Sequence, residues 1–526
     1  MGQTMTKPDY DVAIIGLGPV GSTAAILFAE AGLKVIALER DFEVYKLPRA
    51  VNLDGEIVRA FQAIGRGEEI DALLQKIRPG DRGGFANSER QWMFGRDFKD
   101  FGANGWQPNN MFDQPELEGY LRAIAIGHKN VTAMLGVEAT SFLNRDEAVE
   151  ISVKTVAEER DNEELTVQAR YLVACDGAAS PTRKSLGIPW HDLGYDHEWL
   201  VVDVTTFPGH TLNNDTVQVC DPDRIVTYVC TKDPYRRWEF KLLPGESREE
   251  MLDPERISSL IDSWTPRDTY KVRRAAVYQF HAATAEKWRV GRVFIAGDAA
   301  HQTPPFLGQG MNAGMRDVIN LAWKLELVCK GLADDTLLES YEAERSAHAS
   351  DLVEWAVAIG RLMDHLAEVE RAKRQGAKPP ETPAALKSSG YGQGRESPPI
   401  RGGAVQLDQI TDTGSTGYLF SQPTVTTSSG DSNKLDELLG AGFALVYKES
   451  LRLNETSQKI ISHLNINQIS IDGLTEQRGH LDSLFKQSNC ALVRPDRIVY
   501  GHTTAVMDEN TLLANLAKQL SLTNMP

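Results

Sequence analysis

The chain has 526 residues, a length that predicts two or three domains rather than one hydrophobic core. Its formal net charge of −17 argues against nucleic acid or an anionic membrane surface as the main partner. The sequence contains no apolar run of the ~20 residues that a membrane span needs. It shows no secretory leader pattern at its start and no CxxC pair among its five cysteines, so we expect a cytoplasmic protein with reduced thiols and no metal site.

The N-terminal region has the pattern of a dinucleotide-binding βαβ unit. A short apolar run is followed by a glycine-rich turn, a helix and a second apolar run that ends at Glu39. In this fingerprint the first glycine makes a tight turn, the second admits a pyrophosphate and the third packs helix on strand, while the acid accepts a ribose hydroxyl. The predicted nucleotide-binding residues are Gly16, Gly18, Gly21, Glu39 and Arg40. The pattern does not distinguish FAD from NAD.

Three later segments carry weaker local signals. Arg49 follows Pro48, and from the sequence alone it could be an ordinary surface charge, as most arginines are. Asp113 and Gln114 open a predicted helix, with Asp113 in the capping position. Asp176 follows an apolar run and precedes Gly177, as in an ordinary β-turn. From spacing alone these are a charged loop, a capped helix and a turn.

The residues from about 190 to 281 change character. Runs such as 216–219 and 237–242 alternate between polar and apolar residues, which predicts an antiparallel sheet with one face more exposed than the other. Aromatic residues and a histidine within this region are candidates for a ligand pocket, although each is more often an ordinary core or sheet residue.

Residues 293–296 form another short apolar run, cut off by Gly297 and Asp298 and followed by a proline loop, the turn 308–310 and a helix. In open α/β sheets ligands bind at the carboxyl ends of the strands, which is where Asp298 is expected. Its carboxylate could accept hydrogen bonds from a polyol such as a ribityl chain, and the helix start offers unpaired N–H donors. Turn chemistry alone is equally consistent with a purely structural turn.

The segment 291–317, GRVFIAGDAAHQTPPFLGQGMNAGMRD, resembles the second flavin motif of the class A flavoprotein monooxygenases, the single-component FAD-dependent aromatic hydroxylases. The resemblance implies that Asp298 binds the ribityl chain and that the loop with Pro304 covers the flavin ring where oxygen reacts. It also implies that Arg49 lies beside the flavin, that Gln114 contacts FAD oxygens and that Asp176 serves FAD and the nicotinamide cofactor. The start of the following helix completes the predicted cofactor site with Gly308, Gly310, Met311 and Asn312.

The family's activity sets the expected function. NADH or NADPH, a transient co-substrate, reduces the flavin, and molecular oxygen adds to give a C4a-hydroperoxide that attacks an electron-rich ring. We therefore expect hydroxylation of a phenol-like or N-heteroaromatic substrate in aromatic-compound catabolism. Only one strand–GxGxxG–helix unit is present, so no separate nicotinamide pocket is expected. His281 and Tyr278 are candidate bases, and Trp238, Phe240 and Phe306 are expected to line the substrate site.

The predicted fold class is α/β, with a Rossmann-like FAD-binding domain at 1–189 and 282–370 and an antiparallel-sheet substrate domain at 190–281. A segment rich in Lys, Pro, Gly and Ser at 371–405 predicts a linker. The strand and helix order of 406–526 resembles the thioredoxin-like C-terminal domain of larger phenol-type hydroxylases. Without a CxxC pair, we expect a scaffold role there, or a homodimer contact, rather than redox chemistry.

Other functions remain open on the same fold. A flavin-dependent reductase or dehydrogenase shares both nucleotide motifs, and a Baeyer–Villiger-type oxygenase would act on ketones instead of rings. A flavin halogenase would need a WxWxIP motif, and the sequence has no WxW.

Overall fold

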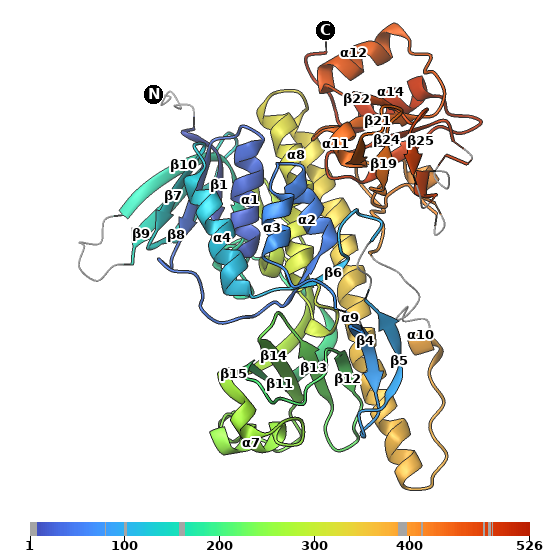
Figure 1. Cartoon of the computed structure of the whole chain (residues 1–526). Coiled ribbons are helices and arrows are strands. Elements are labelled where there is room, and N and C mark those ends of the chain that lie inside the picture. The colour runs from blue at the N-terminus through green and yellow to red at the C-terminus, as the bar shows by residue number, and fades with distance from the viewer. Residues whose placement is uncertain are drawn as a thin grey trace.

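The computed structural model describes residues 8–78, 80–98, 102–156, 164–387, 397–411, 414–476, 479–481, 485–486 and 488–525. Within these ranges the chain forms two large sheets and a separate C-terminal unit, joined by one long helix (Figure 1). The observed architecture is α/β, with both parallel and antiparallel sheets, as predicted from the sequence. No helix of the described residues combines the length and apolarity that crossing a membrane requires.

The first sheet is built around five parallel strands. Their order is β7 (Val131–Leu135), β2 (Val35–Glu39), β1 (Tyr10–Ile15), β10 (Glu164–Ala174) and β17 (Val293–Ile295). All residues of β2 and β17 are buried, as expected for parallel strands covered on both faces. Helices α1 (Pro19–Glu30), α4 (Gln114–Gly127) and α8 (Gly310–Cys329) pack on one face, and β8 (Val137–Asn144) and β9 (Val149–Thr155) cover the other. The short strand β16 (Arg289–Val290) completes the edge beside β17.

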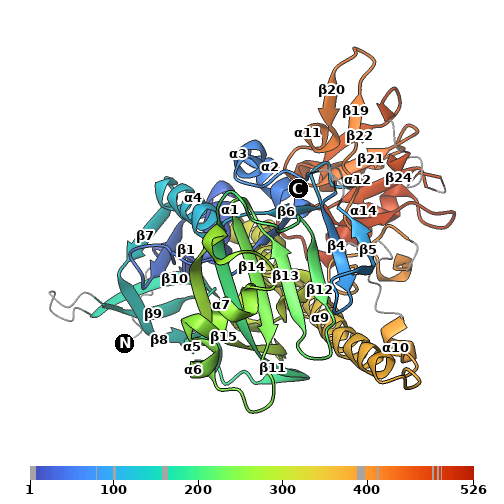
Figure 2. The ribbon, with the colours of Figure 1, turned by 60° about the horizontal axis from the view of Figure 1, so that its bottom comes forward.

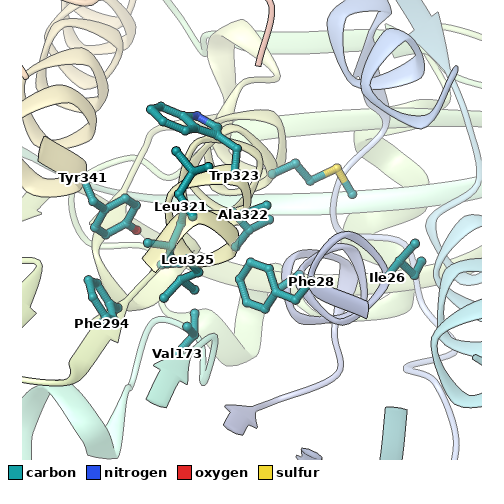
Figure 3. Packing of buried hydrophobic residues seen from close by; sticks show 14 of the residues in the cluster. Ile26, Phe28, Val173, Phe294, Leu321, Ala322, Trp323, Leu325 and Tyr341 are labelled. Atoms are coloured by element: carbon teal, nitrogen blue, oxygen red, sulfur yellow. The ribbon is translucent and has the colours of Figure 1, made fainter. Parts of the chain in front are cut away.

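The main core lies between this sheet and its helices. Figure 3 shows Phe28 of α1 directed toward Ala322 and Leu325 of α8, with Val173 and Phe294 from the ends of β10 and β17 beside them. These side chains are at most 8% exposed, so the C-terminal half of α8 packs closely against α1 and the strands of the first sheet.

The second sheet has eight strands in the order β18 (His301–Gln302), β15 (Tyr270–Ala285), β11 (Trp190–Thr206), β14 (Tyr235–Lys241), β13 (Val226–Cys230), β12 (Thr216–Val219), β4 (Arg82–Ala86) and β5 (Trp92–Asp97). Helices α6 (Arg248–Met251) and α7 (Pro254–Ile261) cover one face. Two strands therefore come from 82–97, inside the range predicted for the FAD-binding domain. Strand pairing across such a long separation leaves no signal in local periodicity.

A single helix, α9 (Glu339–Arg374), is 36 residues long and runs from the first sheet past the second (Figure 2). The first residues of the predicted linker, 371–374, are therefore helical. A short helix, α10 (Ala384–Lys387), follows, and residues 388–396 of that linker lie outside the described ranges.

The C-terminal unit contains a four-stranded sheet in the order β22 (Asn467–Ser470), β21 (Ala444–Tyr447), β24 (Cys490–Val493) and β25 (Val499–His502). Only the β21–β22 pair is parallel. Helix α12 (Glu455–Leu464) connects that pair, and α14 (Glu509–Gln519) follows β25. A smaller sheet of β20 (Ser432–Lys434), β19 (Thr424–Thr426) and β23 (Thr475–Glu476) carries α11 (Leu435–Leu439).

The remaining elements support the loops near the strand ends. They are β3 (Asn52–Asp54), α2 (Gly55–Gln62), α3 (Gly67–Ala72), β6 (Asn109–Met111) and α5 (Pro181–Ser185).

Buried ion pairs join the C-terminal unit to the first sheet's helices. Arg494 of the loop after β24 donates to Glu344 of α9 at 2.8 Å, and Lys324 of α8 lies 3.0 Å from the same carboxylate. A second pair links Arg59 of α2 to Asp436 of α11 at 2.7 Å. The side chains of the first set are fully buried, so each charge depends on its partners.

Replacing Glu344 with alanine should remove the closest carboxylate partner of the buried Lys324 and leave the buried Arg494 with Asp496 alone. We expect a loss of about 3–5 kcal/mol in the free energy of unfolding, measured by denaturant titration. The matched control is Glu326→Ala, which breaks an exposed pair with Lys330 on α8 and should cost less than about 1 kcal/mol. Equal losses in the two variants would contradict the role given to the buried pairs.

The same carboxylate predicts a pH dependence. Burial alone would raise the pKa of Glu344, but Arg494 and Lys324 lower it to about 2. The unfolded chain therefore binds the proton first, so this stabilisation is present above a pH of about 4 and is lost as the pH falls toward 2. Acid unfolding of the parent should show this loss, and Glu344→Ala should lack it.

Candidate active site

Backbone hydrogen bonds bring the carboxyl ends of four parallel strands to one edge of the first sheet. Gly16 N donates to Leu38 O at 2.8 Å, Cys175 N to Ile15 O at 2.8 Å, and Ala296 N to Ala174 O at 3.0 Å. The predicted residues Gly16, Glu39, Asp176 and Asp298 therefore meet at this edge although they are far apart in sequence.

The glycine turn after β1 has the shape that the fingerprint requires. Gly16 has a φ of +92°, and a Cβ on Gly21 would lie 1.8 Å from Gly16 O. A Cβ on Gly18, by contrast, would meet nothing within 4 Å. Helix α1 starts there with no side-chain cap and no acidic residue in its first turn, so its N–H groups and positive end face open space suited to a phosphate.

Glu39 and Arg40 end in different places. Glu39 is buried and accepts hydrogen bonds from Leu17 N at 2.6 Å and Asp41 N at 2.8 Å. Arg122 of α4 lies 3.8 Å from it. Arg40, in contrast, has a side chain that is 65% exposed and contacts only Asp41 among the described residues. The structure thus gives Arg40 no place at the strand edge.

Gln114 organises the loop that carries Arg49. Its Oε1 accepts hydrogen bonds from Arg49 N at 3.0 Å and Ala50 N at 2.7 Å, and its Nε2 donates to Glu118. The guanidinium of Arg49 lies 4.5 Å over the ring of Tyr45. The amide of Gln114 is therefore a fixed support of the loop.

Asp176 and Asp298 each have carboxylate oxygens without a protein hydrogen bond among the described residues. Asp176 uses Oδ2 to accept from Thr182 N at 2.9 Å, while its Oδ1 is buried and unpaired. Asp298 is reached by solvent, yet desolvation raises the pKa of its carboxyl, against the opposing charges of His301 and Arg49. Both features are typical of a carboxylate that lines a recess.

Asp317 of α8 holds the turn that carries Asp298. This fully buried carboxylate accepts hydrogen bonds from Gly297 N at 3.0 Å and Arg345 at 3.0 Å, and it lies 2.9 Å from His301 Nε2. His301 is thereby a buried structural residue. Sequence analysis assigned no role to Asp317, although Asp317 closes the motif on which the family resemblance rests, whereas the segment 341–345 that contains Arg345 is interpreted from the sequence as structural.

The start of α8 is likewise fixed. Gly308 is left-handed with a φ of +64°, and the helix begins at Gly310. The side chain of Asn312 accepts from Asp54 N and donates to Asn52 O and Gly308 O, so only its backbone remains for a ligand. Met311 is half-buried beside it. The first N–H groups of the helix lack intrahelical acceptors, as at any helix start.

The loop after Asp298 packs against one face of the second sheet. Pro304 and Phe306 are buried, and the ring of Phe306 lies 5.3 Å from Trp199 and 6.4 Å from Phe280. Tyr278 shares this face, since it pairs with Trp199 and stacks 6.5 Å from Phe280. Hence the aromatic residues that surround Phe306 on this face are Trp199, Tyr195 and Phe280, none of which sequence analysis identified.

Three of the residues predicted for the substrate site lie on the face of the second sheet opposite Phe306. Trp238 and Phe240 are buried against α6 and α7, where Trp238 packs on Tyr228 at 5.4 Å, and not toward Phe306. His281 points to the same side as they do, is 50% exposed, and lies 3.5 Å from Asp196. Successive residues of a strand face opposite sides, so alternation alone could not tell which set faces the cofactor.

The Tyr278 face also carries charged residues. On β14 they include Arg237, opposite Asp203 of β11, and Glu239, opposite Val201, and on β15 Arg274 lies opposite Asp203. Arg237 donates to Asp203, to Arg49 O and to Pro48 O, and Arg274 also donates to Pro48 O. Thus the second sheet is tied to the Arg49 loop. In the sequence, charged and aromatic residues alternate over 237–241, and this was the signal that charged side chains line one face of the strand.

The described residues fit FAD. The open space at Gly18 before an uncapped helix suits a pyrophosphate, Glu39 lies where a ribose is bound, and the unpaired carboxylate of Asp298 suits a polyol. No group of His, Cys, Asp and Glu among the described residues could hold a metal ion.

Comparison with known proteins agrees with this site. Residues 9–356 match the family described as FAD binding domain, and residues 417–519 match the HcaD C-terminal domain. A 3-(3-hydroxy-phenyl)propionate/3-hydroxycinnamic acid hydroxylase of Escherichia coli (strain K12) is 31% identical over 553 residues, which cover 99% of this chain and 96% of that protein.

Solved structures give the same result. The ternary complex of aklavinone-11 hydroxylase with FAD and aklavinone superposes with a TM-score of 0.80 at 26% identity, over 98% of this chain and 100% of that one. The flavin-dependent monooxygenase PieE, at a TM-score of 0.78 and 19% identity over 98% of this chain and 99% of that one, supports the fold.

The chain belongs to the FAD-dependent aromatic hydroxylases, a class of flavoprotein monooxygenases. Within that class its full length is similar to the 3-(3-hydroxyphenyl)propionate hydroxylases, and FAD is its cofactor.

Asp298→Ala should weaken FAD binding. The change removes an acceptor from the strand edge and leaves ribityl donors unpaired, which costs on the order of 1–3 kcal/mol, or roughly 5- to 150-fold in Kd. Titration of the apoprotein with FAD measures it. Asp298→Asn retains one acceptor and should lose less. If Asp298→Ala binds FAD as tightly as the parent, Asp298 does not contact the cofactor.

Gly18→Ala should separate cofactor binding from folding. Because a Cβ there meets no protein atom, the apoprotein should keep its Tm, while the methyl group occupies the space where the pyrophosphate would approach, so FAD affinity should fall at least tenfold. Gly119→Ala on α4 is the control, since its Cβ also meets nothing within 4 Å and no ligand is expected there. Unchanged FAD affinity in Gly18→Ala would rule out this position for the pyrophosphate.

Proposed function

We propose that this protein is an NAD(P)H-dependent monooxygenase that hydroxylates a phenol-like or N-heteroaromatic ring, in the breakdown of aromatic compounds. The observation that carries the proposal is the position of Pro304 and Phe306: they follow the Asp298 turn directly and pack against an aromatic sheet face. A ring held there would lie between the cofactor edge and the second sheet.

In this proposal the residues of the strand edge hold FAD. Gly16, Gly18, Gly21 and the start of α1 bind the pyrophosphate, and Glu39 binds the adenosine ribose. Asp298 binds the ribityl chain, and the N–H groups at Gly310, Met311 and Asn312 stabilise negative charge on the reduced ring system. Bound FAD supplies the redox chemistry, namely hydride acceptance from NAD(P)H and activation of molecular oxygen.

The chain's own residues orient the substrate and exclude water. Phe306 and Pro304 cover the reacting region, and the buried aromatic face with Trp199, Phe280 and Tyr278 contacts the ring. The hydroxyl of Tyr278 can donate or accept a hydrogen bond at that face. His281 has no part in this proposal because it lies on the opposite face.

NADH or NADPH binds transiently near Arg49 and Asp176 in this proposal. The single glycine fingerprint among the described strands is assigned to FAD, so the nicotinamide needs another surface. The buried unpaired Oδ1 of Asp176 and the half-exposed loop at Arg49 support this placement.

We further propose that the C-terminal unit, 406–526, is thioredoxin-like. The order β22-β21-β24-β25, with one parallel pair joined by α12 and a terminal helix, supports the assignment. Its cysteine, Cys490, is buried and burial raises the pKa of its thiol, which supports a scaffold role over thiol chemistry. In this proposal the FAD-binding domain comprises 1–189 and 282–370 except for β4 and β5, the substrate domain is centred on 190–281, and the connection ends near 405.

The purified protein should be yellow and should oxidise NAD(P)H faster when an aromatic substrate is present. A panel of phenols, hydroxyphenyl acids and N-heteroaromatics under ¹⁸O₂ tests the reaction, with product mass as the readout. One labelled oxygen per product is expected. Anaerobic turnover would instead indicate a reductase or dehydrogenase, and oxygenation of ketones alone a Baeyer–Villiger enzyme.

A further inference from the structure

Glu239 lies on the sheet face that the Pro304 loop covers. It is on β14, opposite Val201 of β11 and Thr227 of β13. Lys241 and Trp199 form the neighbouring pair on the same face. The ring of Phe306, from the Pro304 loop, lies 5.3 Å from the ring of Trp199. Glu239 is only 4% exposed, so its carboxylate is directed into the interior between the sheet and the elements that cover it.

This carboxylate has no hydrogen-bond donor among the described residues. Its nearest cation is Arg237, with Nη1 3.9 Å from Oε1. The donors of Arg237 are already used by Asp203 and by the backbone oxygens of Pro48 and Arg49. Buried carboxylates are normally hydrogen-bonded, because leaving one unpaired costs several kcal/mol. An unpaired one in this position points to a ligand that supplies the donor.

The surroundings limit what that ligand is. Arg237 extends toward the loop at Pro48 and Arg49, on the cofactor side, and Lys241 is held by Asp364 of α9 on the other. Between them the face carries apolar and aromatic groups such as Val201 and Trp199. Arg237 and Arg274 both lie within 4 Å of Asp203, although Nη2 of Arg274 has no hydrogen-bond partner among the described residues, and Lys241 pairs with Asp364. The charge of each of these cations is therefore already balanced by a carboxylate of the chain, and a carboxylate on the substrate would compete with it.

We propose that Glu239 binds the ring hydroxyl or ring N–H of the substrate, and that it selects uncharged aromatic rings over rings that carry a carboxylate. The inference rests on the proposed function and gives it a substrate class. A carboxylate accepts a hydrogen bond from such a donor, which draws electron density toward the ring and favours electrophilic attack. A second carboxylate placed there would meet like charge in a poorly solvated site.

The protonation of Glu239 gives a second readout. Burial raises its pKa to about 7, against the lowering effect of Arg237. Ligand binding that needs the ionised form should therefore strengthen as the pH rises through about 7. The charged and titratable groups that share its face or interact with it are Arg237 and Lys241 on β14, Asp203, His197 and Tyr195 on β11, Arg274 and Tyr278 on β15 and Asp364 on α9. Burial and Lys241 lower the pKa of His197, so its titration lies below that of Glu239.

The test uses 3-(3-hydroxyphenyl)propionate and its methyl ester, which differ in charge but share the ring hydroxyl. Binding to the FAD-loaded protein is followed by the change in flavin absorbance, without NAD(P)H, from pH 6 to 9. The parent should bind the ester at least tenfold tighter than the acid above pH 7. Glu239→Gln should bind the ester about 10- to 100-fold more weakly, lose the pH dependence near 7 and narrow the preference for the ester.

Glu198→Gln is the matched control, because this residue of β11 is half-exposed on the opposite face of the sheet, and among the described residues its side chain pairs only with Arg248. It should bind both probes as the parent does. FAD content and Tm show whether each variant is folded. If Glu239→Gln loses FAD, Glu239→Asp replaces it, and the retained charge should keep the preference for the ester while the shorter side chain weakens binding.

The inference is overturned if the parent prefers the acid, if neither probe binds, or if folded Glu239→Gln binds the ester with the parent's affinity and pH dependence. Because binding is measured without oxygen transfer, this outcome is separate from the proposed function. A parent that binds the ester but releases no oxygenated product from any ring would refute the monooxygenase proposal while leaving the role of Glu239 supported.

Discussion

The buried carboxylate of Asp317 is the interaction on which the site geometry depends. Asp317 lies on α8, and its carboxylate is hydrogen-bonded to Gly297 N just after β17, to His301 in the following loop and to Arg345 of α9. One side chain thereby fixes a strand end, a loop and two helices relative to one another. Because its two oxygens are fully buried, losing Arg345 would leave the Asp317 charge without its cation in the interior. The turn that presents Asp298 is consequently held in place, while the carboxylate of Asp298 has no hydrogen-bond donor among the described residues.

The second sheet reaches the same edge through arginines. Arg237 and Arg274 stand on the face that covers the cofactor region and hold the backbone oxygens of Pro48 and Arg49. Gln114 holds the same loop through the N–H groups of Arg49 and Ala50. The Arg49 loop is thus connected on one side to α4 and on the other to the second sheet. Any ligand that contacts Arg237 or its neighbours would be coupled to that loop through direct hydrogen bonds.

The C-terminal unit contributes stability rather than site residues. Arg494 and Lys324 share the carboxylate of Glu344, and Asp496 accepts a hydrogen bond from Trp323 Nε1 of α8. Trp323 and Lys324 lie in the C-terminal half of α8. The C-terminal unit therefore contacts this helix far from its start at Gly310, the end proposed to bind the cofactor. Burying this many charges between two units also makes their mutual orientation specific, because a shifted interface would leave several of them unpaired.

The sequence by itself determined the elements whose chemistry is local. The glycine fingerprint, Glu39 at the end of β2 and the Gly297-Asp298 turn follow from residues close together in the chain, because tight turns and buried strands have strong compositional requirements. Only the tertiary structure decided which side chains of the second sheet face the Pro304 loop, since a shift of one residue reverses the face. Trp238, Phe240 and His281 lie on the face opposite Phe306, while Glu239 and Trp199 lie on the Phe306 face. The membership of β4 and β5 in the second sheet and the supporting role of Asp317 were likewise decided by contacts between residues distant in sequence, which periodicity and turn chemistry do not encode.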